Sequence, residues 1–153
     1  RSPIWDDRAR GAFAGLTLVH RRGHLARAVL EGAAFALRHV AEPILRAGVG
    51  VRGMVVSGPG AGAGIAAAIK ADVTGFPVTI PEVPETAMLG AAILASLGIQ
   101  AWPDAPAAMA GMVRAASRLE PDVRLRDRYD ATFAAYRSLW PSIEPVSHRL
   151  GEA

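Results

Sequence analysis

A glycine-rich turn, Gly58-Pro59-Gly60-Ala61-Gly62-Ala63-Gly64, holds the residues best suited to chemistry in this sequence. An apolar run precedes it at 54–57 and an Ala/Ile segment follows at 65–72, so the order predicts a buried strand, a tight turn and a helix. Glycine lets the backbone approach a ligand, and a helix N-terminus presents unpaired N–H groups. Such a turn can therefore cradle a phosphate or a nucleotide. Many α/β domains carry the same turn without a ligand, so the motif alone leaves both interpretations open.

Other reactive residue types do not form a pattern. The absence of cysteine excludes disulfides and thiolate-bound metals. The histidines are scattered, and Gly23 separates His20 from His24 near the expected start of a helix. We therefore expect no metal site in this chain.

Composition narrows the class of protein. With 153 residues, 51% of them hydrophobic and 20% charged, the chain can bury one sizeable core and is expected to form one domain. It has no apolar run long enough to cross a bilayer and no signal peptide, which predicts a cytoplasmic location and no membrane partner. The formal net charge is only +3, and arginines alternate with acidic residues, as at 124–128. This pattern is typical of solvated helix faces, so no nucleic acid partner is expected.

The elements that would position the turn can be read from periodicity. Alternating residues at 11–18 predict a short strand, and apolar residues every three to four positions from His24 predict a long amphipathic helix. Pro43 should kink this helix or end it near Ala41. Gly75 should end the helix that follows the turn, and residues 77–81 are expected to form a short strand, whose prolines place it at the edge of a sheet or at a strand tip.

The second half of the chain predicts mainly helices. They cover 85–97, 105–114 with Asp104 as N-cap, and 122–139, with an extended segment at 118–121. An aromatic stripe on the last helix is expected to belong to the core: Tyr129, Phe133, Tyr136 and Trp140.

A dinucleotide-binding domain is the main alternative from another class. Gly58, Gly60 and Ala63 have the required spacing, and Glu82 follows the next strand where a ribose-binding acid belongs. That fold needs a further strand-helix-strand after Glu82, where mainly helices are expected. It also leaves residues 1–48 without an explanation.

Several stretches carry a family resemblance: Pro3-Ile4-Trp5-Asp6 with Ala9-Arg10-Gly11, the segment 11–16 leading into 24–31, the glycine turn with 71–78 and 85–92, and the tail 128–141. Together they resemble the carboxy-terminal half of the FGGY carbohydrate kinases, and within them the xylulokinase branch. The resemblance covers essentially all of residues 1–153. It implies an α/β lobe of the actin-like, ribonuclease-H-like ATPase fold, a small mixed sheet packed with several helices.

The resemblance also implies a transferase activity. In this family ATP, with Mg²⁺, lies between two lobes, and the γ-phosphoryl group passes to a hydroxyl of a sugar or polyol. The general base is an aspartate of the amino-terminal lobe, so the resemblance places no catalytic residue in this chain. Because phosphoryl transfer needs base, metal and phosphates together, the isolated lobe should be inactive. The sugar is not specified, although a xylulose-like pentulose is favoured, and the oligomeric state stays open, a homodimer included.

Matching the family turn residue by residue assigns nucleotide binding to Gly58, Pro59, Gly60, Ala61, Gly62 and Ala63. Pro59 and Ala63 depart from the family pattern and remove a backbone N–H and a side-chain hydrogen bond. Ala66 stands where the family usually has a tryptophan. These departures keep open a catalytically impaired relative that binds nucleotide or sugar as a sensor.

The resemblance also directs attention to three polar sites outside the turn. Trp5 and Asp6 form a candidate cleft loop, although an ordered interface loop is the favoured interpretation. Asp72, at the end of the helix after the turn, is expected to be structural. Arg27 and Glu31 match the family signature and are expected to pair along their helix.

Overall fold

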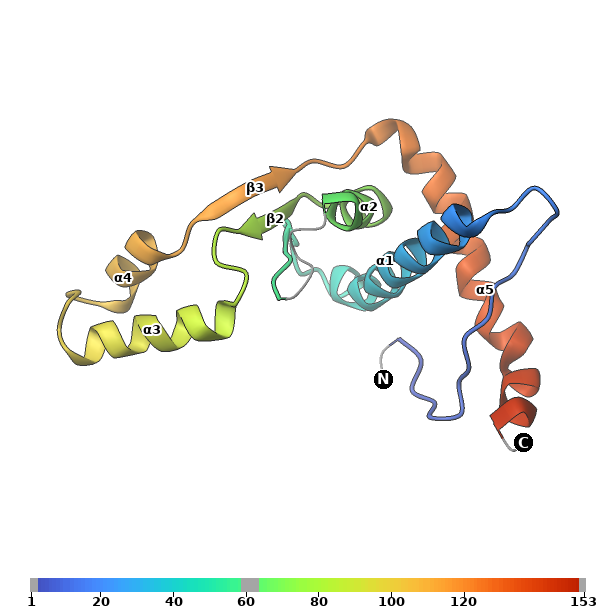
Figure 1. Ribbon diagram of the computed structural model, residues 1–153, viewed down its shortest axis with the longest axis horizontal. Helices are drawn as coiled ribbons and strands as arrows, with labels where there is room; N and C mark the ends of the chain where they lie inside the picture. Colours follow the sequence, from blue (N-terminus) through green and yellow to red (C-terminus); the bar gives the residue numbers. More distant parts are fainter. Residues whose placement is uncertain (1–2, 59–63, 152–153) are drawn as a thin grey trace. The chain divides into compact units, whose positions relative to one another are not determined.

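The computed structural model describes residues 3–58 and 64–151. In this part of the chain the elements are, in order, α1 (Arg22–Arg46), β1 (Met54–Val55), α2 (Gly64–Thr74), β2 (Val78–Pro81), α3 (Thr86–Gly98), α4 (Ala105–Met112), β3 (Ala115–Leu119), the 3₁₀ helix η1 (Val123–Leu125) and α5 (Arg126–Gly151) (Figure 1). The predicted α/β class with a small mixed sheet is confirmed. None of these described helices is both long and apolar enough to span a membrane.

Contacts divide the chain into two compact units. The first contains 1–50, 72–74 and 122–153, and the second contains 51–71 and 75–121. In the first unit α1 packs against α5 through an aromatic cluster built around Phe35, whose ring centroid lies 6.0 Å from that of Phe133 and 6.1 Å from that of Tyr129. All three side chains are buried. The predicted aromatic core on the last helix is therefore confirmed for Tyr129 and Phe133.

Arg38 holds the first unit together at a second point. Its guanidinium lies 4.4 Å from the centre of the Phe133 ring, pairs with Asp130 and donates to the Val73 carbonyl oxygen at 3.2 Å. One side chain of α1 thereby contacts α5 and the carboxyl end of α2.

The second unit is built on a three-stranded sheet of order β1-β2-β3. Strands β1 and β2 are parallel and α2 connects them, whereas β3 is antiparallel to β2. The helix buries Ala67 and Ala71 against Val78 of β2, and four half-buried apolar residues complete this core: Met54, Val56, Ile80 and Leu119. The small alanines let α2 lie close to the sheet.

Helices α3 and α4 form a helical pair within the second unit. Asp104 caps α4 by accepting a hydrogen bond from the Ala107 N–H at 2.8 Å, as predicted. The indole of Trp102 occupies the space beside Gly111, where an added Cβ would lie 2.3 Å from Trp102 Cη2. Gly111 is therefore required by close packing.

The two strand predictions had different outcomes: the one at 11–18 was wrong, and the one at 77–81 is confirmed as β2. Residues 11–18 form no strand, because no described strand pairs with them and an unpaired strand leaves its backbone groups without partners. Strand β2 is central in the sheet, so of the two places expected for its prolines the sheet edge is wrong and the strand tip is correct. Its prolines are tolerated because Pro77 precedes the strand and Pro81 ends it, at a register shift after Ile80.

Two helices continue through prolines. Pro43 was expected to kink α1 or to end it near Ala41, and Pro141 was expected to lie beyond the last helix. Helix α1 runs past Pro43 to Arg46, since a proline in the last turn removes a single hydrogen bond. Helix α5 continues past 139 to Gly151 and includes Pro141 and Pro145. Both prolines are exposed and lie four residues apart on one face, so water can bond the carbonyl groups that they leave unpaired. Gly75, by contrast, ends α2 as predicted, with φ of 72° and its N–H bonded to the Ala71 carbonyl oxygen.

Candidate functional site

The glycine turn begins at the carboxyl end of β1. Gly58 has φ of 89°, in the left-handed region that favours glycine, and its N–H donates to the Pro84 carbonyl oxygen at 2.9 Å. This bond attaches the turn to the loop before α3, so the Gly58 N–H is already used within the protein. The other predicted nucleotide-binding residues lie outside the described residues: Pro59, Gly60, Ala61, Gly62 and Ala63.

Groups that can bind an anion lie at the carboxyl ends of β1 and β2. Because β1 and β2 are parallel, their carboxyl ends meet there, and α2 and α3 each begin just after one of these strands. The Thr86 hydroxyl, at the start of α3, donates to the Ser57 hydroxyl at 3.3 Å. Helix N-termini at such an edge favour phosphate oxygens. The sequence reasoning missed Ser57 and Thr86, although both adjoin the motifs that it used.

Asp72 takes the structural role that was expected of it. Its carboxylate accepts a hydrogen bond from the Asp122 N–H at 2.8 Å. It therefore fixes the backbone just before η1, and this bond connects α2 to the start of the last helical region.

The Trp5-Asp6 loop is attached to the carboxyl-terminal half of α5. Asp6 lies 2.6 Å from His148 Nε2 and accepts from the Arg8 N–H at 2.8 Å, while the Ser147 hydroxyl accepts from the Arg10 N–H at 2.7 Å. The hydrogen bond to His148, followed by that from Arg8, lowers the pKa of Asp6 below its usual 3.8. The Trp5 side chain is 86% exposed. Within the first unit, the Asp6 carboxylate thus holds this loop in place, whereas the Trp5 indole is exposed.

Asp6 also belongs to a group with the composition of a metal site. Ligand atoms of Asp6, Glu144 and His148 all lie within 4.8 Å of one another, and the three residues are half-buried. Such nitrogen and oxygen donors suit a divalent cation. The direct bond between Asp6 and His148 already satisfies two members of the group. The sequence could not show it, because Asp6 is far from the other two along the chain.

The predicted pair on α1 is confirmed and gains a third member. Arg27 Nε donates to Glu31 Oε1 at 2.7 Å, and the same carboxylate oxygen accepts from the Tyr129 hydroxyl at 3.0 Å. Burial raises the pKa of Tyr129, and the hydrogen bond to Glu31 raises the pKa of Arg27. Family-signature residues of α1 are therefore satisfied within the protein.

Comparisons with known proteins identify the fold. Over 92% of this chain and 28% of the other, it is similar to the xylulose kinase from Rhodospirillum rubrum, with a TM-score of 0.78 and 31% identity. The gluconate kinase from Lactobacillus acidophilus has the same fold, with a TM-score of 0.81 over 94% of this chain and 29% of its own, at 24% identity. The protein is thus an α/β lobe of the actin-like ATPase fold.

Sequence comparison identifies the family. Residues 1–99 match the FGGY family of carbohydrate kinases, C-terminal domain, and the chain belongs to this family. It is 40% identical over 134 residues to the glycerol kinase of Dechloromonas aromatica (strain RCB), an alignment that covers 87% of this chain and 26% of that enzyme. The chain spans about a quarter of the length of such relatives. The predicted family resemblance is therefore confirmed.

Proposed function

We propose that this chain is the nucleotide-binding lobe of an ATP-dependent kinase that phosphorylates a small sugar or polyol. The observation that carries the proposal is the strand-helix unit of β1 and α2 in an FGGY-family chain, in which the Gly58 N–H after β1 bonds to the Pro84 carbonyl oxygen just before α3. Two helix N-termini and two hydroxyl groups at that edge suit the oxygens of a nucleotide phosphate. A cytoplasmic location, where ATP is available, belongs to the same proposal.

The chain's own contribution would be binding and positioning. Its turn would face the nucleotide, the attachment of Gly58 to the Pro84 carbonyl oxygen would keep the turn beside α3, and Asp72 would hold the far end of α2. ATP with Mg²⁺ would supply the phosphoryl group that is transferred. An amino-terminal lobe of the same protein would supply the base that activates the sugar hydroxyl, and closure of the two lobes would bring these groups together.

The proposed domain is the whole of residues 1–153. The family match ends at 99, but the R. rubrum structure covers 92% of the chain. Helix α5 also buries Tyr129 and Phe133 against α1, which lies within the matched region. These contacts of α5 with α1 support including the carboxyl-terminal segment in the proposed domain.

Glycerol and xylulose are the first substrates to test. Glycerol kinase is the name of the Dechloromonas aromatica relative at 40% identity, and xylulose kinase is that of the R. rubrum structure at 31%. The sequence favoured a xylulose-like pentulose, whereas the higher identity favours glycerol. Both are small polyhydroxylated molecules with a terminal hydroxyl that can accept a phosphoryl group.

Turnover by the full protein that carries this chain tests the proposal. Phosphorylation should be measured with ATP and Mg²⁺ on glycerol, xylulose and gluconate, with the 153-residue chain alone as control. We expect rapid turnover of one substrate by the full protein and none by the isolated chain. No turnover on any of the three would contradict the kinase assignment.

A catalytically impaired relative is the second candidate. It is favoured by Pro59 and Ala63, which each remove a hydrogen bond that the family turn supplies. Nucleotide binding without turnover on the same panel would select this alternative.

A further inference from the structure

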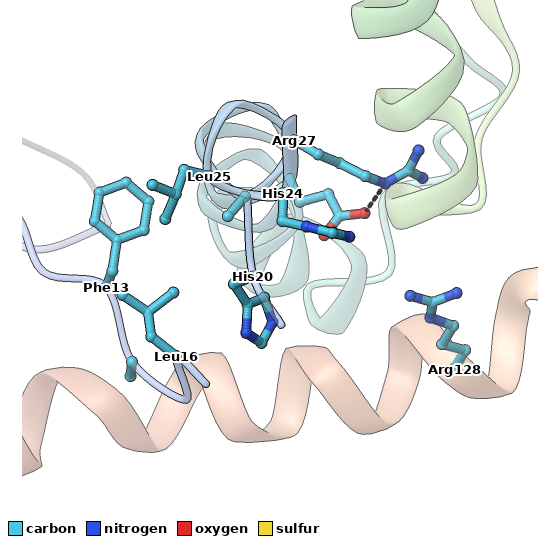
Figure 2. A pocket seen from close by; sticks show the side chains of 10 residues that line it. Phe13, Leu16, His20, His24, Leu25, Arg27 and Arg128 are labelled. Carbon is cyan, nitrogen blue, oxygen red and sulfur yellow. Dashed lines mark hydrogen bonds and ion pairs between the residues drawn. The ribbon is translucent and has the colours of Figure 1, made fainter. Parts of the chain in front are cut away.

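The first unit contains a groove that the proposed kinase function does not use. Its volume is about 210 Å³, and it is lined by the loop before α1, the first turns of α1 and one side chain of α5: Phe13, Ala14, Leu16, His20, His24, Leu25, Arg27, Ala28, Glu31 and Arg128. In Figure 2, Phe13, Leu16 and Leu25 lie on one side, Arg27 and Arg128 on the other, and the two histidines between them. The groove thus has an apolar wall and a basic wall.

Backbone hydrogen bonds fix the tautomer of both histidines. The Thr17 N–H donates to His20 Nδ1 at 2.9 Å, and the Arg21 N–H donates to His24 Nδ1 at 3.0 Å. Since Nδ1 is the acceptor in both neutral rings, the ring proton lies on Nε2. Each histidine therefore has an Nε2–H donor that no described residue uses.

The charges of the groove leave one cation uncompensated. Glu31 is its only acidic residue, and Glu31 Oε1 already accepts from Arg27 and Tyr129. Arg128 has no ion-pair or hydrogen-bond partner for its guanidinium within residues 3–58 and 64–151. The groove therefore has unused donors on Arg128 and on the two imidazoles, and its unpaired charge is positive.

We propose that this groove binds a small organic phosphate. An arginine fork and two imidazole N–H groups match the several oxygens of a phosphate, and the Phe13 and Leu16 side chains, about half exposed, would cover its organic part. Ligand pockets for drug-sized molecules are typically about 300–1,000 Å³, so the groove suits a compact anion rather than a whole nucleotide. The inference stands apart from the proposed kinase function, because it uses none of the residues of the glycine turn.

Calorimetric titration of the full protein that carries this chain tests the inference, with saturating ADP present to occupy the proposed nucleotide site. The probes are phenyl phosphate, inorganic phosphate, benzoate and benzyl alcohol. We expect phenyl phosphate to bind most tightly, because it alone combines a phosphate with an apolar group. Equal or tighter binding of benzoate or benzyl alcohol, or no binding of phenyl phosphate, would overturn the proposal.

Matched variants locate the binding. Arg128→Gln should weaken phenyl phosphate binding about tenfold, because it removes a charged hydrogen-bond donor, and Arg128→Lys should retain part of the affinity. Arg149→Gln is the control, since it removes an exposed arginine of the same helix that does not line the groove. Its affinity should stay within about twofold of the unaltered protein. Equal weakening by Arg149→Gln and Arg128→Gln would show unspecific charge attraction and overturn the assignment, and circular dichroism verifies that the variants are folded.

Discussion

At the scale of single residues, Asp6 determines how the loop before α1 is held. Its carboxylate contacts His148 and accepts from the Arg8 N–H, and these contacts lower its pKa. A carboxyl group whose pKa is lowered by folding stabilises the folded state above its ordinary pKa, here 3.8. That contribution is lost as the pH falls through the lowered value.

We predict that Asp6→Ala increases amide hydrogen exchange at Arg8 and Arg10 at neutral pH. The Arg8 N–H loses its acceptor, and the Arg10 N–H, which bonds to Ser147, then lies in a loop that Asp6 no longer attaches to α5. Asp7→Ala is the control, since Asp7 is exposed and its side chain forms none of these bonds. As the pH falls below the lowered pKa of Asp6, the unaltered protein should approach the variant. Unchanged exchange in Asp6→Ala would show that Ser147 alone holds the loop.

Arg38 is the second residue whose role can be measured. It joins α1 to Asp130, to the Phe133 ring and to the Val73 carbonyl oxygen, and its side chain is 15% exposed. Because Asp130 is 43% exposed, solvent screens the ion pair, and most of the effect should come from the other two contacts.

Arg38→Ala should lower the free energy of unfolding by about 1–3 kcal/mol in urea denaturation. Arg46→Ala serves as comparison, since Arg46 pairs with Glu42 at an exposed position of the same helix. Such surface pairs contribute about 0–1 kcal/mol. An equal effect of both substitutions would contradict the role given to Arg38.

At the scale of elements, the α3-α4 pair depends on a glycine that the sequence did not single out. A Cβ at Gly111 would overlap the Trp102 indole, whereas nothing lies within 4 Å of a Cβ at Gly90 on α3. Substituting Gly111 therefore tests the effect of close packing, and substituting Gly90 tests the effect of helix propensity alone.

We predict that Gly111→Ala destabilises the protein by about 1–3 kcal/mol, as overpacking does, and shifts the Trp102 fluorescence. Gly90→Ala should be neutral or stabilising by up to about 1 kcal/mol, because alanine favours the helix. Thermal unfolding measures both variants. Similar stability of the two would show that Trp102 moves aside without cost.

Helices were predictable because their signals are local. The period of three to four residues located α1, Asp104 marked the start of α4, and the stripe of Tyr129 and Phe133 identified the buried face of α5. Prolines were harder, since their cost depends on exposure and on position within the helix. Pro43 and Pro141 lie where the lost hydrogen bond is tolerated, and residue type alone does not show this.

Strands and the polar clusters depend on partners that the sequence does not name. Residues 11–18 alternate like a strand, yet a strand forms only beside another, and none of the described strands pairs with them. The glycine turn was visible as a motif, but Ser57 and Thr86 meet only because β1 and β2 are parallel. The Asp6-Glu144-His148 group likewise joins opposite ends of the chain.

At the scale of the whole molecule, this chain belongs to the FGGY family of carbohydrate kinases and spans about a quarter of the length of its relatives. We propose that its glycine turn forms one wall of a nucleotide site that a second lobe completes. Pro59 lacks the backbone N–H, and Ala63 lacks the side-chain hydrogen bond, that the family pattern supplies at these two positions. Restoring the family residues there should therefore strengthen nucleotide binding.

The most direct measurement is the affinity of the full protein for ADP, compared with that of the double variant Pro59→Gly, Ala63→Ser. Ala131→Ser, at an exposed position of α5, is the control. We expect ADP to bind the unaltered protein and the double variant to bind it several-fold to about 100-fold more tightly, since each neutral hydrogen bond contributes about 0.5–1.5 kcal/mol. Absence of ADP binding, or an affinity that the double variant leaves unchanged, would contradict the nucleotide site at the glycine turn.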